Sequence, residues 1–171
     1  MRLLDVRHLG RERVIGCWEI DGVLIDPGPT SSMDNLIEAL GGERPRALLL
    51  THIHLDHAGA SGALVRRWPE LPVYVHERGA RHLADPTKLL ASAERLYGDQ
   101  LERLWGEVAP VPEQNLRALV RRGGDARLSG RLHAGSRLAP RQLLAPADRP
   151  RLRRRRGRRA DTAERLRAAW A

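Results

Sequence analysis

Cysteine, lysine and aromatic residues are scarce in this chain of 171 residues, which holds one cysteine, Cys17, and no phenylalanine. A single cysteine excludes an internal disulfide and a structural zinc site of the usual multi-cysteine kind, and it fits a reducing cytoplasm. No stretch reaches the ~18 apolar residues of a membrane span, and residues 1–5 lack the apolar run of a secretory signal. We therefore expect a cytoplasmic protein that does not bind membranes.

Charge and residue type change together near residue 116. Residues 1–116 carry 13 Lys+Arg and 17 Asp+Glu, a net charge of −4, whereas residues 117–171 carry 17 Arg and 4 Asp+Glu, a net charge of +13. After Val120 there is no isoleucine, valine, tyrosine or methionine, and Trp170 is the sole aromatic residue. Strands favour β-branched and aromatic residues. We therefore predict one domain over residues 1–116, followed by a disordered, low-complexity, Arg-rich tail over residues 117–171.

Three histidines and one aspartate lie within six positions, directly after the apolar run of residues 47–50. They are His52, His54, Asp56 and His57. Imidazole and carboxylate groups are the usual nitrogen and oxygen ligands of zinc and similar metals. On a strand, His52 and His54 would point to the same face, and a following turn could bring the other two to a second site. The spacing predicts two neighbouring metal ions, and the alternative is a polar loop with incidental histidines.

The H-x-H-x-D-H segment resembles the signature of the metallo-β-lactamase superfamily of metallo-hydrolases, and the similarity extends to about Asn115. It implies the N-terminal half of an αβ/βα sandwich. The expected strands and the acidic turn after them cover residues 14–20 and 22–28, with residues 45–50 leading into the metal loop and a further strand at residues 73–76. The expected helices cover residues 32–40, 62–68 and 86–106, and the last resembles the helical insert of glyoxalase-II-like members.

The resemblance also implies roles for the four side chains. His52 and His54 would bind the first metal, and Asp56 and His57 the second, with Asp56 also assigned as the catalytic residue. The implied metal is zinc, two ions per site, although the same donors accept iron or manganese. A water bridging the metals would become a hydroxide near neutral pH. The implied activity is hydrolysis of a small-molecule ester, thioester or lactone.

The other acidic and histidine residues carry weaker signals. Asp26 either orients a ligand histidine from outside the metal shell or is an ordinary turn aspartate, and both interpretations stay open. His76 is interpreted as a histidine at the end of a strand. His8 and His82 lie in no motif and are interpreted as ordinary surface residues.

The second half of the family pattern is missing. A histidine in a T-P-G-H segment, an aspartate after a strand ending in G-D and a last histidine should complete the two sites. None of these segments occurs, and the only histidine after position 82, His133, lacks such a context. We therefore expect impaired hydrolysis, and a non-catalytic metal-binding remnant is the alternative. The missing loops would also build the substrate pocket, so the substrate is not predicted.

The Arg-rich tail has two interpretations. A genuine basic tail would bind nucleic acid through phosphates, non-specifically, because it lacks stacking aromatics and any groove-reading motif. The other interpretation is a shift of reading frame between about Leu116 and His133. Codons compatible with residues 133–143, read one base later, encode T-P-G-H-A-S-H-H-V-S, and those for residues 148–156 encode T-G-P-A-F-V-G-D. Because both missing segments emerge in one frame and in family order, we favour the frameshift.

Overall fold

The computed structural model describes residues 1–120 and 129–130. Most of the Arg-rich tail, including His133, lies outside the described residues. Within them one sheet forms from β1 (Arg2–Asp5), β2 (Gly16–Ile20), β3 (Val23–Ile25), β4 (Ala47–Leu49), β5 (Val73–His76), β6 (Leu116–Val120) and β7 (Ser129–Gly130). The α-helices are α1 (Met33–Ala39), α2 (Leu55–Ala58), α3 (Ser61–Arg67), α4 (Glu77–Ala84), α5 (Thr87–Tyr97) and α6 (Leu101–Trp105). Short 3-10 turns are η1 (His8–Gly10), η2 (Thr30–Ser32), η3 (Gly98–Gln100) and η4 (Glu113–Asn115).

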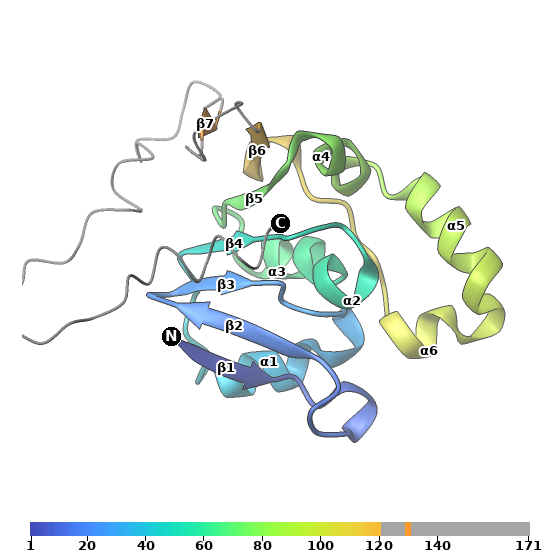
Figure 1. Ribbon diagram of the computed structural model, residues 1–171, viewed down its shortest axis with the longest axis horizontal. Helices are drawn as coiled ribbons and strands as arrows, with labels where there is room; N and C mark the ends of the chain where they lie inside the picture. Colours follow the sequence, from blue (N-terminus) through green and yellow to red (C-terminus); the bar gives the residue numbers. More distant parts are fainter. Residues whose placement is uncertain (121–128, 131–171) are drawn as a thin grey trace, which may run out of the picture. The chain divides into compact units, whose positions relative to one another are not determined.

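The strands lie in the sheet in their order along the chain (Figure 1). The first three pair antiparallel, β3 to β6 pair parallel, and β7 returns antiparallel. Parallel neighbours need a crossover, and the three crossovers contain α1, then α2 and α3, then α4 to α6. This is the mixed α/β sheet that the sequence predicts, and it brings the carboxyl ends of β3 and β4 together at one edge.

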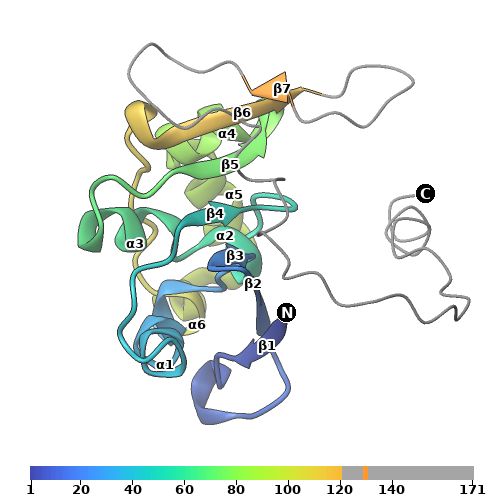
Figure 2. The same cartoon turned by 90° about the vertical axis from the view of Figure 1, so that its left-hand side faces the viewer.

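The two faces of the sheet differ in how well they are covered. One face packs its apolar side chains against α1 and α3, which lie on the same side of the sheet (Figure 2). Leu24, Leu48 and Val73 on this face are fully buried. The opposite face is also apolar, yet Leu3 is 55% and Trp18 42% exposed there. The domain therefore has one well-packed face and one apolar face that is only partly covered.

The elements largely follow the pattern expected from sequence, but several differ. The stretch expected as one helix over residues 86–106 is two helices, because the backbone at Gly98 turns to φ 53° and ends α5. Strand β1 and helices α2 and α4 were not predicted. Strand β6 continues four residues past the boundary expected at residue 116, and β7 lies within the predicted tail. In the described part of the chain, no helix is long and apolar enough to cross a membrane.

Candidate metal centre

The four predicted ligands lie where the chain leaves the sheet. Strand β4 ends at Leu49, and His52 and His54 follow it in the loop that leads to α2. Asp56 and His57 lie within the short helix α2 itself. Ligand sites in open α/β sheets form outside the carboxyl ends of the strands, and this loop occupies such an edge.

The four side chains form one cluster. The rings of His52 and His54 lie 4.7 Å apart, and those of His52 and His57 lie 3.9 Å apart, measured between centroids. The Nε2 atom of His57 is 3.3 Å from Oδ2 of Asp56. The sequence therefore predicted correctly which side chains come together, since all four meet at the same end of the sheet.

Asp26 arranges two of the histidines from the neighbouring strand end. Its Oδ2 atom accepts hydrogen bonds from Nδ1 of His57 at 2.9 Å and from the hydroxyl of Thr51 at 2.6 Å, and its Oδ1 atom accepts from the Thr51 amide. Because the Thr51 hydroxyl donates to Asp26, it accepts from Nδ1 of His52, 2.9 Å away. Both histidines thus carry a proton on Nδ1, which leaves Nε2 as the ring nitrogen that could bind a metal.

These contacts show that both interpretations of Asp26 apply. It is a turn residue, with φ at 53°, and it also orients His57 directly. No role for Thr51 was predicted from the sequence, although it directly precedes the motif. Its function depends on a hydrogen bond across to another strand end, which residue spacing along the chain does not reveal.

The environment keeps His52 in the form that binds metal. Burial lowers its pKa, and the neighbouring His57 and His54 lower it further, while the carboxylates of Asp26 and Asp56 act in the opposite direction. A ligating imidazole must be unprotonated. The lowered pKa therefore widens the pH range in which His52 can act as a ligand.

One pair of donor atoms has the spacing expected of two ligands on the same metal ion. Two ligands of one tetrahedral zinc with bonds of about 2.0–2.1 Å lie roughly 3.3 Å apart, and this matches the separation of Asp56 Oδ2 and His57 Nε2. In residues 1–120 and 129–130, however, no three His, Cys, Asp or Glu side chains are placed to surround one ion. Cys17 adds no ligand here, since burial raises the pKa of its thiol to about 12. The described fold supplies donor pairs, and further ligands would have to come from elsewhere.

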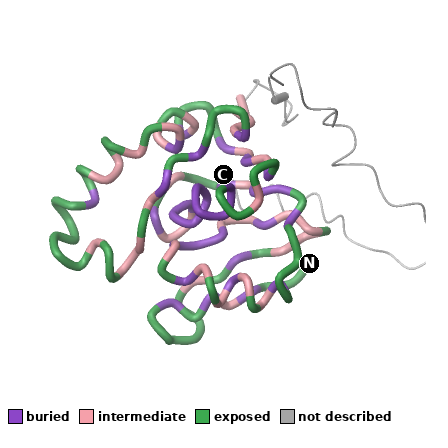
Figure 3. Tube along the Cα trace, turned by 180° about the vertical axis from the view of Figure 1, so that it is seen from behind, coloured by how far each residue is buried: buried purple, intermediate pink, exposed green. Residues whose placement is uncertain are grey.

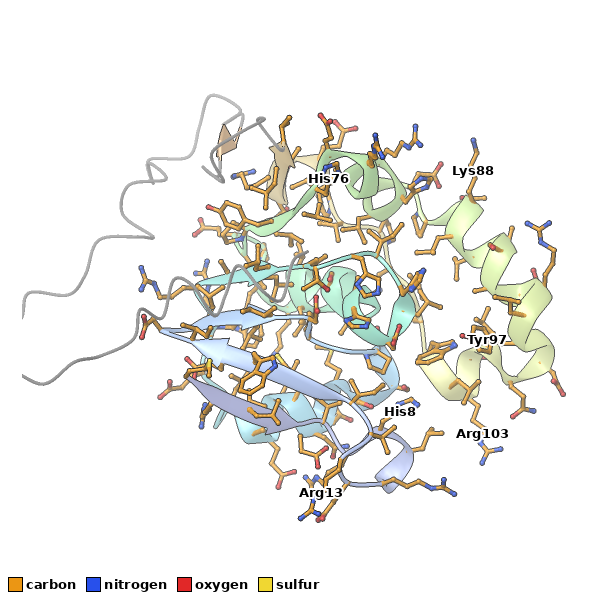
Figure 4. The ribbon with its side chains drawn as sticks, viewed as in Figure 1. His8, Arg13, His76, Lys88, Tyr97 and Arg103 are labelled. Carbon is orange, nitrogen blue, oxygen red and sulfur yellow. The ribbon has the colours of Figure 1, made fainter. Side chains whose placement is uncertain are left out.

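The remaining histidines occupy other positions. His76 is exposed at the end of β5, as expected, and its Nδ1 accepts from the Arg78 amide at the start of α4. His82 is partly exposed on α4. The interpretation of His8 as a surface residue was wrong. It is 6% exposed, its ring stacks on Trp105, and its Nδ1 lies 3.2 Å from the Ser32 hydroxyl (Figure 4).

His8 is buried because α6, more than ninety residues later in the chain, covers it. Its own neighbourhood in the sequence has no apolar periodicity that would have indicated this. Two surface hollows lie along α4 and the start of α5, and they are lined by Glu77, Arg78, Arg81, His82, Asp85 and Lys88. None of the candidate ligands lines them, so they are separate from the metal cluster.

The chain is similar to known proteins. The family model of the metallo-beta-lactamase superfamily matches residues 19–139. A hydroxyacylglutathione hydrolase of Hamiltonella defensa is 37% identical over 79 residues, which are 44% of this chain and 29% of that protein. A probable metallo-hydrolase, YqgX of Bacillus subtilis, is 38% identical over 63 residues, which are 37% of this chain and 29% of that protein. The chain thus spans less than a third of these relatives.

Among solved structures, the di-iron-bound form of TTHA1623 is 28% identical, with a TM-score of 0.44, and the match covers 61% of this chain and 48% of that one. The family model itself spans well over half of the present chain and includes the complete histidine–aspartate cluster. Members of that family depend on metal ions. The chain belongs to the metallo-β-lactamase superfamily.

Proposed function

We propose that the chain is a metal-dependent hydrolase whose reaction centre is the cluster of His52, His54, Asp56 and His57. The substrate class is a small-molecule ester, thioester or lactone. The observation that carries the proposal is the paired support of two imidazoles by one carboxylate, directly to His57 and through Thr51 to His52. Surface histidines have no need of such an arrangement, whereas metal ligands usually have it.

Each residue of the cluster and its surroundings would have a separate role at the metal centre. Asp26 holds the Nδ1 proton of His57, and Thr51 holds that of His52, so the Nε2 atom of each ring is the one that would bind a metal. Asp56 adds a carboxylate oxygen next to His57. A bound metal would supply a water of lowered pKa and polarise the substrate carbonyl. Zinc is our proposed metal, and these donors are also compatible with iron or manganese.

The names of two relatives support a narrower choice of substrate, and the buried cysteine supports a choice of compartment. The Hamiltonella and Xylella relatives are named hydroxyacylglutathione hydrolases, which favours a thioester within the proposed substrate class. The buried single cysteine fits a reducing compartment, and we propose the cytoplasm. Binding of nucleic acid by the Arg-rich tail is not part of the proposal, since that tail lies mostly outside the described residues.

A second function, a non-catalytic metal-binding remnant, is favoured by one observation. The described donors form pairs, whereas catalytic zinc commonly takes three ligands from protein. We therefore propose that hydrolysis by this chain is impaired, and that the family activity depends on ligands which the T-P-G-H and G-D segments would add.

Rates of hydrolysis on thioester, lactone and ester substrates test the proposal. The chain as written is compared with a chain whose reading frame is restored after about residue 116, at the same zinc loading, with free zinc as the baseline. We expect the first to act little better than free zinc and the second to act faster by orders of magnitude. The restored chain carrying His52→Ala and His54→Ala is the control and should fall back to the baseline.

Two results would contradict this account. If the restored chain is no faster than free zinc, the proposed hydrolase function is wrong. If the chain as written matches the restored chain, the proposed impairment is wrong, and His133 becomes the first residue to mutate.

A further inference from the structure

The helices α5 and α6 with the turn η3 between them form an arm, residues 87–105, that extends from the body of the domain (Figure 1). The structure describes the whole arm, and Ala93 is its only buried residue. Most of the remaining arm is exposed or half-exposed (Figure 3). Such a lightly packed element needs a specific attachment if it is to keep its place.

The attachment lies at the end of α6. The Trp105 ring stacks on buried His8, with 5.5 Å between centroids and 16° between planes, and Tyr97 meets Trp105 edge-on at 5.3 Å. The Ser31 hydroxyl donates to the Leu104 carbonyl at 2.7 Å. Just after the helix, Gly106 approaches so closely that an added Cβ would come within 2.7 Å of the Ser31 nitrogen. The arm is therefore fixed to η1 and η2.

The segment around η2 is also hydrogen-bonded to α2 and the two residues after it. The Thr30 hydroxyl donates to the Gly59 carbonyl at 3.1 Å. The Gly28 amide donates to the His57 carbonyl at 3.1 Å, and the Ala60 amide donates to the Gly28 carbonyl at 2.8 Å. Together with Asp26, these bonds connect the segment of residues 26–32 to α2 at several successive points.

This connecting segment is stiff. Pro27 and Pro29 are both fully buried, and proline fixes its backbone φ angle. The backbone at Asp26 and Gly28 takes positive φ values of 53° and 84°, which leaves little freedom for either to readjust. Little backbone rotation is therefore available between Ser31 and Gly28, whose amide is bonded to the His57 carbonyl in α2.

We propose that Trp105 is a positioning residue for the candidate metal centre and acts through residues 26–32. By docking the arm against His8 and η2, it holds the segment whose hydrogen bonds fix α2 and orient His57. The part of this inference that concerns metal rests on the proposed function. The mechanical coupling between arm and α2 rests on the contacts alone.

Amide hydrogen exchange of the metal-free full-length protein tests the coupling. The amides of Gly28 and Ala60 close the bonds between the segment and α2. Trp105→Ala should speed their exchange by about tenfold, because local opening becomes easier. The matched control is Leu96→Ala, which removes an apolar side chain, 77% exposed, from the same arm and should leave these amides unchanged. Trp105→Phe keeps an aromatic stack and should restore most of the protection.

Zinc affinity measured against a competing chelator gives the second readout. Trp105→Ala should weaken zinc binding by roughly twofold to thirtyfold, the range of mutations that act through such a contact network, and Leu96→Ala should not. If Trp105→Ala does not fold, Ser31→Ala, which removes one hydrogen bond, takes its place with the same expected direction.

The inference is overturned if the Trp105 and Leu96 variants are indistinguishable at Gly28 and Ala60. If exchange responds to Trp105→Ala while zinc affinity does not, α2 is coupled to the arm but the ligands are not, and the positioning role is overturned. If the wild-type chain binds no zinc at all, the proposed function fails, and the exchange comparison still decides the coupling.

Discussion

A single carboxylate, that of Asp26, controls two of the four candidate ligands. It accepts the Nδ1 proton of His57 and, through the Thr51 hydroxyl, fixes the ring of His52. Neither Asp26 nor Thr51 needs to touch a metal to affect how tightly one is bound. At the scale of residues, we therefore expect this pair to affect metal affinity in addition to the ligands themselves.

Asp26→Asn should weaken zinc binding by about tenfold, as the loss of such an outer hydrogen-bond partner commonly does. Asparagine keeps the size of the side chain. It removes the negative charge that accepts from His57 directly and supports His52 through Thr51. Chelator competition measures the effect. Asp85→Asn, the same change at a carboxylate that bonds only Thr87, is the control, and equal zinc affinity in the two variants would show that Asp26 has no role in the centre.

His8 should make stability depend on pH. Burial lowers its pKa below the ordinary value of 6.5, and nearby Asp56 offsets this only in part. The unfolded chain therefore binds the proton more readily, so stability is fully present above about pH 6.5 and declines as pH falls through and below that value. Replacing the residue as His8→Gln should flatten part of this decline.

Urea unfolding at pH 7.5 and pH 5.5 measures the difference between the wild-type chain and His8→Gln. The partly exposed His82, replaced as His82→Gln, is the control and should keep the wild-type pH dependence. Parallel curves for wild type and His8→Gln would contradict the assignment of a protonation cost to His8.

At the scale of elements, α3 packs closely against the backbone of the segment that follows α6. Gly62 lies against the backbone after α6, where an added Cβ would come 2.1 Å from the Ala109 carbonyl oxygen. Real side chains do not approach backbone so closely, and Ala109 is itself buried. Only glycine permits this contact.

Gly62→Ala should lower the free energy of unfolding by about 1–3 kcal/mol, the usual effect of overpacking. Gly16→Ala is the matched control, since its Cβ would meet the end of the flexible, exposed Leu3 side chain. The control should cost much less. Equal unfolding midpoints for the two variants would contradict the close packing of α3.

Sequence periodicity predicted the elements with strong apolar patterns, such as α1 and α3, to within one residue at each end. It missed α4, whose few apolar residues include only Leu83 as a large buried one. It joined α5 and α6 because their apolar spacing continues through Gly98. The proximity of the four candidate ligands was predicted, whereas the contacts of Thr51 and His8 were not, because these arise between distant segments.

The whole domain shows an apolar sheet face that is partly exposed, with Leu3 and Trp18 as its most open positions. The resemblance to half of an αβ/βα sandwich predicts such a face, because the second sheet of that sandwich would pack on it. Exposed apolar patches promote association. The partly exposed sheet face therefore predicts that the chain self-associates in solution.

Trp18→Glu should reduce self-association, measured by light scattering over a concentration series, without lowering the unfolding midpoint. A buried position would not tolerate this charge, but Trp18 is 42% exposed. The control is Trp68→Glu, at a partly buried tryptophan that packs against the core, and it should destabilise the fold. Unchanged scattering by Trp18→Glu would show that this face does not drive association.

Zinc titration of the full chain by calorimetry tests the central claim most directly. The wild-type chain and the surface variant His76→Ala with His82→Ala should both bind zinc measurably but weakly, since the described donors form pairs. The variant His52→Ala with His54→Ala should lose most of that binding. No binding by the folded wild-type chain, or equal binding by the His52 and His54 variant, would contradict the claim that this cluster is a metal centre.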